Sequence, residues 1–177
     1  MPSQPLPVYR PGRTGESNLA ALFRAVGAGD AEGWAKSEAR EGIAQLGRCL
    51  VLRAFWDGVV RAGDAWIERA VASGRDGGPT IFDDAGPALG RLLAAGADRE
   101  DLTSLVRSMQ AMAIDHVCNV LDDSGMVMST YPADVAGALK AYDWGLFEVT
   151  PNGRIGRPIG GLHESVLQVE LGADRTG

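Results

Sequence analysis

Apolar side chains recur at helical spacing along most of the chain, and the densest run covers residues 43–71, without a proline. At 100° per residue, Ile43 and Leu50 fall on one stripe, while Phe55 and Trp66 fall on a second stripe turned by about 120°. A helix that is apolar around so much of its circumference must be covered on more than one side. The pattern therefore predicts a long central helix over residues 43–71, covered within one domain or at a dimer interface.

A second long helical pattern covers residues 102–121, where one face is apolar for more than about five turns. The residues on this face are Leu102, Leu105, Val106, Met109, Met112, Ala113, Val117, Val120 and Leu121. We expect this face to point into the core. Shorter helices are predicted after the cap candidates Ser17 or Asn18, after Asp30, and from Pro132 onward.

Glycine, proline and β-forming residues predict the remaining elements. Residues 73–79 read Ser-Gly-Arg-Asp-Gly-Gly-Pro and predict a loop, after which Asp83 or Asp84 can cap a helix. Residues 144–160 are rich in β-formers and contain a Pro-Asn-Gly turn signal, which predicts a hairpin. Residues 162–167 predict a single helical turn.

Together these elements predict a mainly α fold, a bundle of five or six helices around a long central helix, with a small C-terminal β-hairpin at about residues 144–160. A length of 177 residues fits one domain. The proline-rich residues 1–16 predict a flexible arm, residues 17–172 a single helical domain, and residues 173–177 a frayed tail.

The net charge of the chain disfavours some classes of binding partner. The net charge is −6 and the sequence pI is about 4.9, with both signs dispersed along the chain. This disfavours binding to nucleic acid or to anionic lipid. No apolar run approaches the ~20 residues of a membrane span, and residues 1–14 lack the apolar core of a signal peptide, so we expect a cytoplasmic protein. Cys49 and Cys118 lie in apolar helical patterns and are expected to be buried thiols.

Candidate chemistry centres on the two histidines. His116 falls near the middle of the apolar face of the helix predicted over residues 102–121, where a neutral imidazole needs a hydrogen-bond partner. It can be a core histidine, a pocket base or a metal ligand. His163 and Glu164 lie together in a glycine-flanked segment and, with Trp144, can line a cleft, although a helical turn that tethers the C-terminus explains them equally well.

Charged residues supply two further candidate sites. Glu38-x-x-Glu41 superficially resembles the first half of the metal motif of bundle nucleotide pyrophosphohydrolases of the MazG type, but the second half is absent. Solvated faces and caps explain these carboxylates more simply, so we expect neither a metal nor another cofactor. Arg154 and Arg157 can grip a carboxylate or a phosphate, or can protect the edge of the hairpin with charge.

No nucleophile motif or phosphate-binding loop accompanies these residues. The sequence therefore favours an acidic, cytoplasmic protein-binding or regulatory domain, similar to a small inhibitor or immunity protein, whose partner is another protein or a second copy. The alternative is an enzyme or small-ligand binder with a pocket between the C-terminal hairpin and the helix over residues 102–121. That pocket would use His116, His163 and Glu164.

Overall fold

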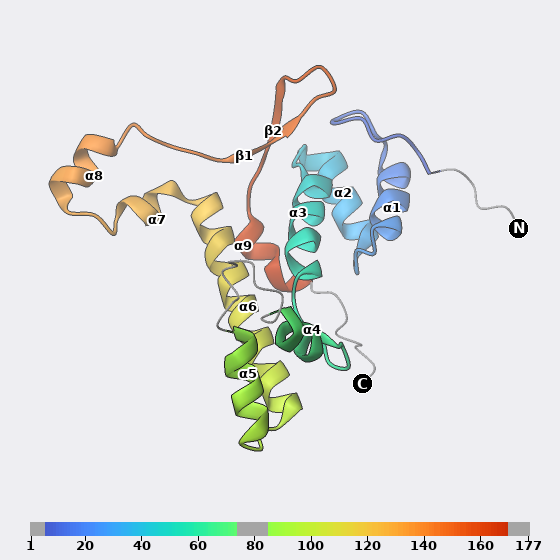
Figure 1. Cartoon of the computed structure of the whole chain (residues 1–177). Coiled ribbons are helices and arrows are strands. Elements are labelled where there is room, and N and C mark those ends of the chain that lie inside the picture. Colours follow the sequence, from blue (N-terminus) through green and yellow to red (C-terminus); the bar gives the residue numbers. More distant parts are fainter. Residues whose placement is uncertain (1–5, 74–84, 170–177) are drawn as a thin grey trace, which may run out of the picture. The chain divides into compact units, whose positions relative to one another are not determined.

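The computed structural model describes residues 6–73 and 85–169 (Figure 1). Most of the predicted loop over residues 73–79, the cap candidates Asp83 and Asp84, and the tail over residues 173–177 lie outside the described residues. The protein is mainly helical and has a two-stranded antiparallel hairpin near its C-terminus, which confirms the predicted fold class. Among the described helices, none is both long and apolar enough to cross a bilayer.

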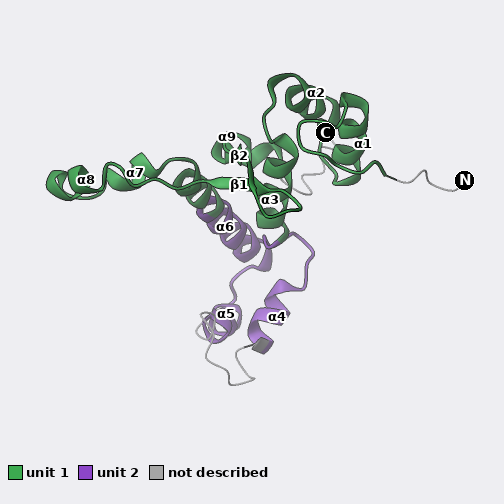
Figure 2. Cartoon of the chain, turned by 90° about the horizontal axis from the view of Figure 1, so that it is seen from above, with its two compact units in different colours: residues 1–57, 114–177 green, residues 58–113 purple. Residues whose placement is uncertain are grey.

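Contacts divide the chain into two compact units (Figure 2). Unit 1 comprises residues 1–57 and 114–177, and unit 2 comprises residues 58–113. The single-domain organisation inferred from the sequence stays a prediction. Unit 1 contains α1 (Glu16–Ala25), α2 (Ala31–Glu41), α3 (Gln45–Asp57), the second part of α6 (Arg99–Asp122), α7 (Ser124–Met128), α8 (Ala133–Leu139), α9 (Leu162–Ser165), the 3-10 turn η1 (Val166–Gln168), β1 (Leu146–Val149) and β2 (Ile155–Ile159).

The core of unit 1 is built from α1, α2 and α3. Phe23 of α1 packs against Trp34 of α2, with ring centroids 5.9 Å apart. The predicted cap Asp30 starts α2 by accepting a hydrogen bond from the Gly33 amide at 2.9 Å. Trp56 of α3 is fully buried and donates its indole N–H to the Val166 carbonyl at 2.7 Å, which ties the C-terminal turn to α3.

The hairpin prediction is confirmed. β1 and β2 pair antiparallel with Leu146 opposite Ile159, and the register shifts between Phe147 and Val149. Gly47 lets β2 pack closely against α3, because a Cβ atom at this position would lie 3.0 Å from the side chain of Ile159. The predicted helical turn over residues 162–167 is also present, as α9 and the 3-10 turn.

Unit 2 contains α4 (Trp66–Ser73), α5 (Ala85–Ala94) and the first part of α6. Ile67, Leu89 and Leu102, one from each helix, form its buried cluster. The α4 and α5 helices touch closely, since a Cβ atom on Gly86 would lie 2.4 Å from the Ala70 carbonyl oxygen.

The prediction of one continuous helix over residues 43–71 is wrong. The α3 helix ends at Asp57 and α4 begins at Trp66. Gly63, in the connecting segment, has a φ of +76°, which only glycine adopts without strain. The Val60 amide donates to the Gln110 side chain at 2.9 Å instead of to a helical carbonyl. The one long helix in the described ranges is α6, with 24 residues.

The predicted inner face of α6 is also wrong over most of its length. Leu105, Met109 and Met112 are 57–65% exposed, whereas Cys118, on the opposite side by helical angle, is fully buried. Polar side chains hold the first part of α6 to its neighbours: Thr103 accepts a hydrogen bond from the Trp66 indole at 2.9 Å. Periodicity identified the apolar stripe but could not tell whether another element covers it.

Candidate functional site

The structure separates the two histidines of the predicted pocket by environment. His116 lies on the exposed side of α6, so its predicted inward position is wrong. His163, at the start of α9, places Nδ1 2.7 Å from Asp122 Oδ2, and its backbone amide donates to the same oxygen at 2.9 Å. Asp122 is 5% exposed and His163 is 42% exposed. This pair joins the end of α6 to α9, and it leaves the other face of the imidazole open to solvent.

Glu164, next to His163, borders a cavity of about 350 Å³ in unit 1. The cavity is open to solvent and is lined by α2, α3 and the C-terminal turn, and Arg48 of α3 contributes a guanidinium to it. Burial lowers the pKa of Arg48, while the carboxylates of Glu164 and Asp122 raise it. Arginine nevertheless keeps its charge at every physiological pH. The cavity is therefore lined by one permanent cation, Arg48, together with the carboxylates of Asp30 and Glu164.

Arg157, a predicted ligand-binding residue, instead holds unit 1 together. Its guanidinium donates to Glu148 of β1 and to Glu38 of α2, each at 2.8 Å, and to the carbonyls of Gly42 and Ile43, each at 3.2 Å. The hydrogen bond from Arg157 lowers the pKa of Glu148, and burial opposes it. Both carboxylates are at least nine-tenths buried. These donors and acceptors satisfy one another, which makes this a structural network.

Tyr9 completes this network from the N-terminal segment. Its hydroxyl lies 2.7 Å from Glu38 Oε1 and 2.8 Å from Glu148 Oε1, and it also contacts the Arg157 guanidinium. Burial raises the pKa of Tyr9, and the hydrogen bonds to the two glutamates raise it further. Part of the segment predicted to be a flexible arm is therefore bonded to α2 and the hairpin.

The other sequence candidates have separate environments. Glu41 and Arg154 are exposed, at the end of α2 and at the hairpin turn. Trp144 is half-buried and donates its indole N–H to the Val120 carbonyl at 2.7 Å. Glu38, the weak metal candidate, accepts hydrogen bonds from the Leu46 amide at 2.7 Å and from the Arg157 guanidinium at 2.8 Å. No cluster of three potential metal ligands occurs within residues 6–73 and 85–169.

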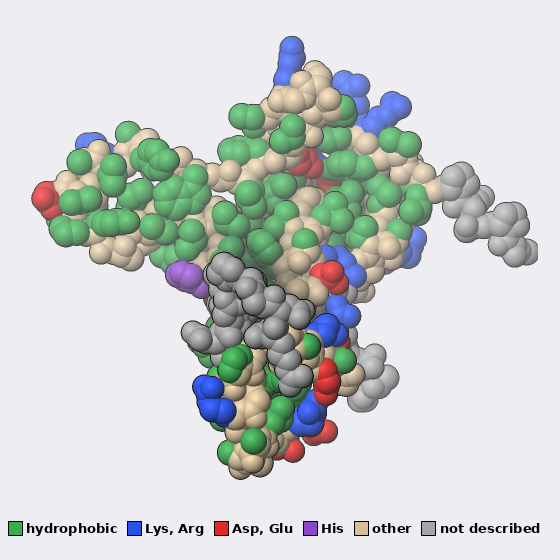
Figure 3. Space-filling model, viewed as in Figure 1, with side chains coloured by type: hydrophobic (Ala, Val, Ile, Leu, Met, Phe, Trp, Pro, Cys, Tyr) green, Lys and Arg blue, Asp and Glu red, His purple; other side chains and the backbone are tan. Residues whose placement is uncertain are grey.

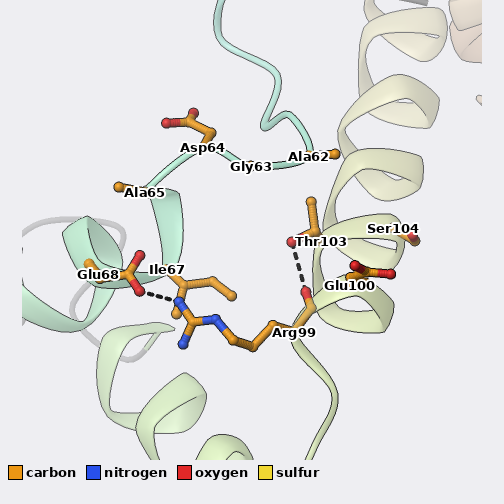
Figure 4. Close-up of a pocket in the computed structure, with 10 residues that line it drawn as sticks. All are labelled: Ala62, Gly63, Asp64, Ala65, Ile67, Glu68, Arg99, Glu100, Thr103 and Ser104. Atoms are coloured by element: carbon orange, nitrogen blue, oxygen red, sulfur yellow. Dashed lines mark hydrogen bonds and ion pairs between the residues drawn. The ribbon is translucent and has the colours of Figure 1, made fainter.

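Unit 2 has a cavity of its own, of about 580 Å³, between residues 62–68 and the start of α6 (Figure 4). Its charged and polar groups pair with one another. Arg99 forms an ion pair with Glu68, and the Thr103 hydroxyl donates to the Arg99 carbonyl at 2.8 Å. Figure 4 shows Asp64 and Glu100 pointing away from the hollow between these groups. The arrangement leaves little free polar chemistry for a ligand.

Residues 124–143 form a helical excursion between α6 and β1, and none of them is buried. Its base is closed by two hydrogen bonds: Ser124 Oγ donates to Asp143 Oδ1 at 2.5 Å, and Trp144 is bonded to α6 as described above. Among the described elements, no helix or strand makes an extended contact with α7 or α8. The excursion therefore has no covering element in the described chain.

The excursion nevertheless carries large apolar side chains, and green atoms dominate this part of Figure 3. Tyr131, Val135, Leu139 and Tyr142 are between 38% and 65% exposed. Val135 and Leu139, four residues apart, share one face of α8, and Tyr131 and Tyr142 flank the two ends of this helix. We call these four residues the α8 stripe. An apolar stripe of this size on a segment without a core is typical of a contact surface.

Sequence reasoning proposed the helix after Pro132 but not its exposure. Asp122 and Arg48 were also missed, because a carboxylate at a helix end and an arginine inside an apolar run look like a cap and a solvated strip. The burial prediction for Cys49 and Cys118 is confirmed, and in the described structure neither thiol forms a disulfide. Comparison with protein-family models, curated proteins and solved structures finds no match for this chain.

Proposed function

We propose that this chain is a protein-binding domain that acts by contact through the α8 stripe, and that its partner is a second copy of the chain. The observation that carries the proposal is the excursion over residues 124–143, which has four large exposed apolar side chains and no buried residue. Burying a side chain of this kind contributes about 1.5–3 kcal/mol. An uncovered stripe therefore favours association.

The charge distribution makes the excursion the surface through which two copies can pair. The chain has a net charge of −6, so two copies repel each other over most of their surfaces. The excursion carries only Asp134, Lys140 and Asp143, and Asp143 is already bonded to Ser124. A twofold pairing sets the same patch on both copies, and two α8 stripes offer each other apolar surface with little opposing charge.

This proposal keeps the regulatory, inhibitor-like role that the sequence favours. In that role, dimerisation through α8 determines whether other molecules can bind to the excursion. The proposal also places the chain in the cytoplasm, where reducing conditions keep Cys49 and Cys118 as free thiols.

The test is a concentration series of the full chain, ¹⁵N-labelled and observed by NMR. We expect amide signals of residues 131–142 to shift with protein concentration, and the shifts to disappear in a Val135→Ser/Leu139→Ser variant. The matched control is Val149→Ser/Ile155→Ser, which removes two apolar side chains from the hairpin that are 71% and 76% exposed, more than Val135 and Leu139. Shifts confined to other elements, or no shifts at high concentration, would contradict the proposal.

A further inference from the structure

The cavity beside Arg48 carries an inference that is independent of the α8 stripe. Its inner wall is formed by Trp34, Gln45 and Ser165, which are all at least nine-tenths buried, with Ser37 and Arg48 half-buried beside them. Glu164 lies at the exposed rim. An indole, two hydroxyls, an amide and a guanidinium thus converge on one hollow of unit 1.

Two buried polar atoms at this cavity have no hydrogen-bond partner in the described structure. They are Gln45 Oε1 and Arg48 Nε. Gln45 is held in place through its other end, since its Nε2 donates to Ser37 Oγ at 2.9 Å. Leaving a buried polar group unpaired is costly, and the cost is higher for a charged one. The wall of the cavity therefore contains an acceptor and a charged donor that are unpaired in the described structure and covered by neighbouring atoms.

The guanidinium of Arg48 lies against the backbone of the C-terminal turn. Gly161 has a φ of +70°, and a Cβ atom there would lie 2.5 Å from Arg48 Nη2, so the guanidinium lies directly over this glycine. Its one recorded hydrogen bond goes to Ser165 Oγ, at 3.3 Å. Most of its donors thus remain for a ligand, and a planar guanidinium is well suited to bind a carboxylate through two parallel hydrogen bonds.

We infer that this cavity binds the carboxylate of a small amphoteric molecule, either a free α-amino acid or the C-terminal residue of a peptide. The carboxylate would pair with Arg48 and the Ser165 hydroxyl. The carboxylates of Asp30 and Glu164, which also line the cavity, would favour an ammonium group next to that carboxylate. A volume of about 350 Å³ is at the small end of the range for ligand pockets, which suits a molecule of this size.

The test uses the full chain, ¹⁵N-labelled, with the indole N–H of Trp34 and the amide of Ser165 as reporters. A panel of common free amino acids is titrated, then the primary amide of each one that binds, then short peptides with free or amidated C-termini. We expect at least one free amino acid or one free-acid peptide to shift both signals. Its amide should bind at least about tenfold more weakly, because the charge-assisted hydrogen bonds are lost.

The pattern of binding identifies the source of the carboxylate. Binding of single amino acids points to a free ligand, whereas binding of free-acid peptides alone points to a protein C-terminus. If nothing in either series shifts the two reporters, or if the amides bind as tightly as the acids, the inference is overturned. This comparison of acid with amide needs no variant, so it holds whatever the effect of mutations on folding.

Variants of Arg48 then test whether its guanidinium binds the carboxylate of the ligand. Arg48→Met is expected to weaken binding at least about tenfold, and Arg48→Lys, which keeps the charge but loses the planar fork, should fall between Arg48→Met and the unmodified chain. The control is Arg91→Met, a similar change on the exposed side of α5 in unit 2, which should leave binding unchanged. Unchanged binding in a folded Arg48→Met protein would overturn the inference.

Discussion

Arg157 offers the sharpest test of how unit 1 is held together. Replacing it with methionine keeps the apolar stem but removes the cation between Glu38 and Glu148, which are 3% and 8% exposed. Removing one partner of a buried ion pair costs about 3–5 kcal/mol, because it leaves an uncompensated buried charge. Here two carboxylates and two carbonyls each lose the hydrogen bonds that Arg157 donates, so we expect a loss within that range.

The assay is chemical denaturation followed by tryptophan fluorescence in a Trp66→Phe background. The remaining tryptophans, Trp34, Trp56 and Trp144, all belong to unit 1, so the signal reports its unfolding alone. The matched control is Arg154→Met, three residues away in the exposed hairpin turn, which should change the free energy of unfolding by no more than about 0.5 kcal/mol.

The pH dependence supplies a second readout. Arg157 lowers the pKa of Glu148 in the folded state, so its stabilisation is present above the ordinary glutamate pKa and is lost as pH falls through the lowered value. The difference between Arg157→Met and the parent should therefore be largest near neutral pH and shrink in acid. Equal losses for Arg157→Met and Arg154→Met, or a difference that grows in acid, would refute the reasoning.

Two further predictions concern packing. Gly86→Ala should destabilise unit 2 by about 1–3 kcal/mol, because the new Cβ meets the Ala70 carbonyl, whereas Gly90→Ala in the same helix meets nothing and should be neutral or stabilising; hydrogen exchange of α4 and α5 measures both. Burial raises the pKa of the Cys118 thiol to about 11, and Asp122 and Asp115 add to the rise. The native protein should therefore resist a thiol reagent at neutral pH and react after denaturation; fast labelling of the folded chain would count against this burial.

Local sequence signals correctly predicted the elements that depend on neighbouring residues. Asp30 capped its helix, and the Pro-Asn-Gly turn gave the hairpin, because caps and tight turns depend on a few neighbouring residues. The break between α3 and α4 was missed because the apolar period continues through residues 58–65. There, the Val60 amide donates to the Gln110 side chain and the Val60 carbonyl accepts from Arg107, in place of helical hydrogen bonds, and such partners are distant in sequence.

The candidate sites were harder to predict, because they depend on partners that are distant in the sequence. The sequence marked Arg157 as a ligand residue because an arginine in a glycine-rich turn looks free, yet its partner Glu38 lies 119 positions away. His163 and Glu164 were proposed as a pair, but Asp122 and Arg48, which give them their environment, come from other helices. Hydrophobic periodicity also cannot distinguish a buried stripe from an exposed one, which is why the apolar face of α6 was assigned to the core.

Sedimentation equilibrium of the full chain over a wide concentration range tests the proposed function most directly. We predict a reversible equilibrium between monomer and dimer. A Leu139→Asp variant, which places a charge in the middle of the α8 stripe, should weaken the dimer at least about tenfold. A chain that stays monomeric at every concentration, or a dimer that Leu139→Asp leaves unchanged, would contradict the proposal that this protein acts through α8.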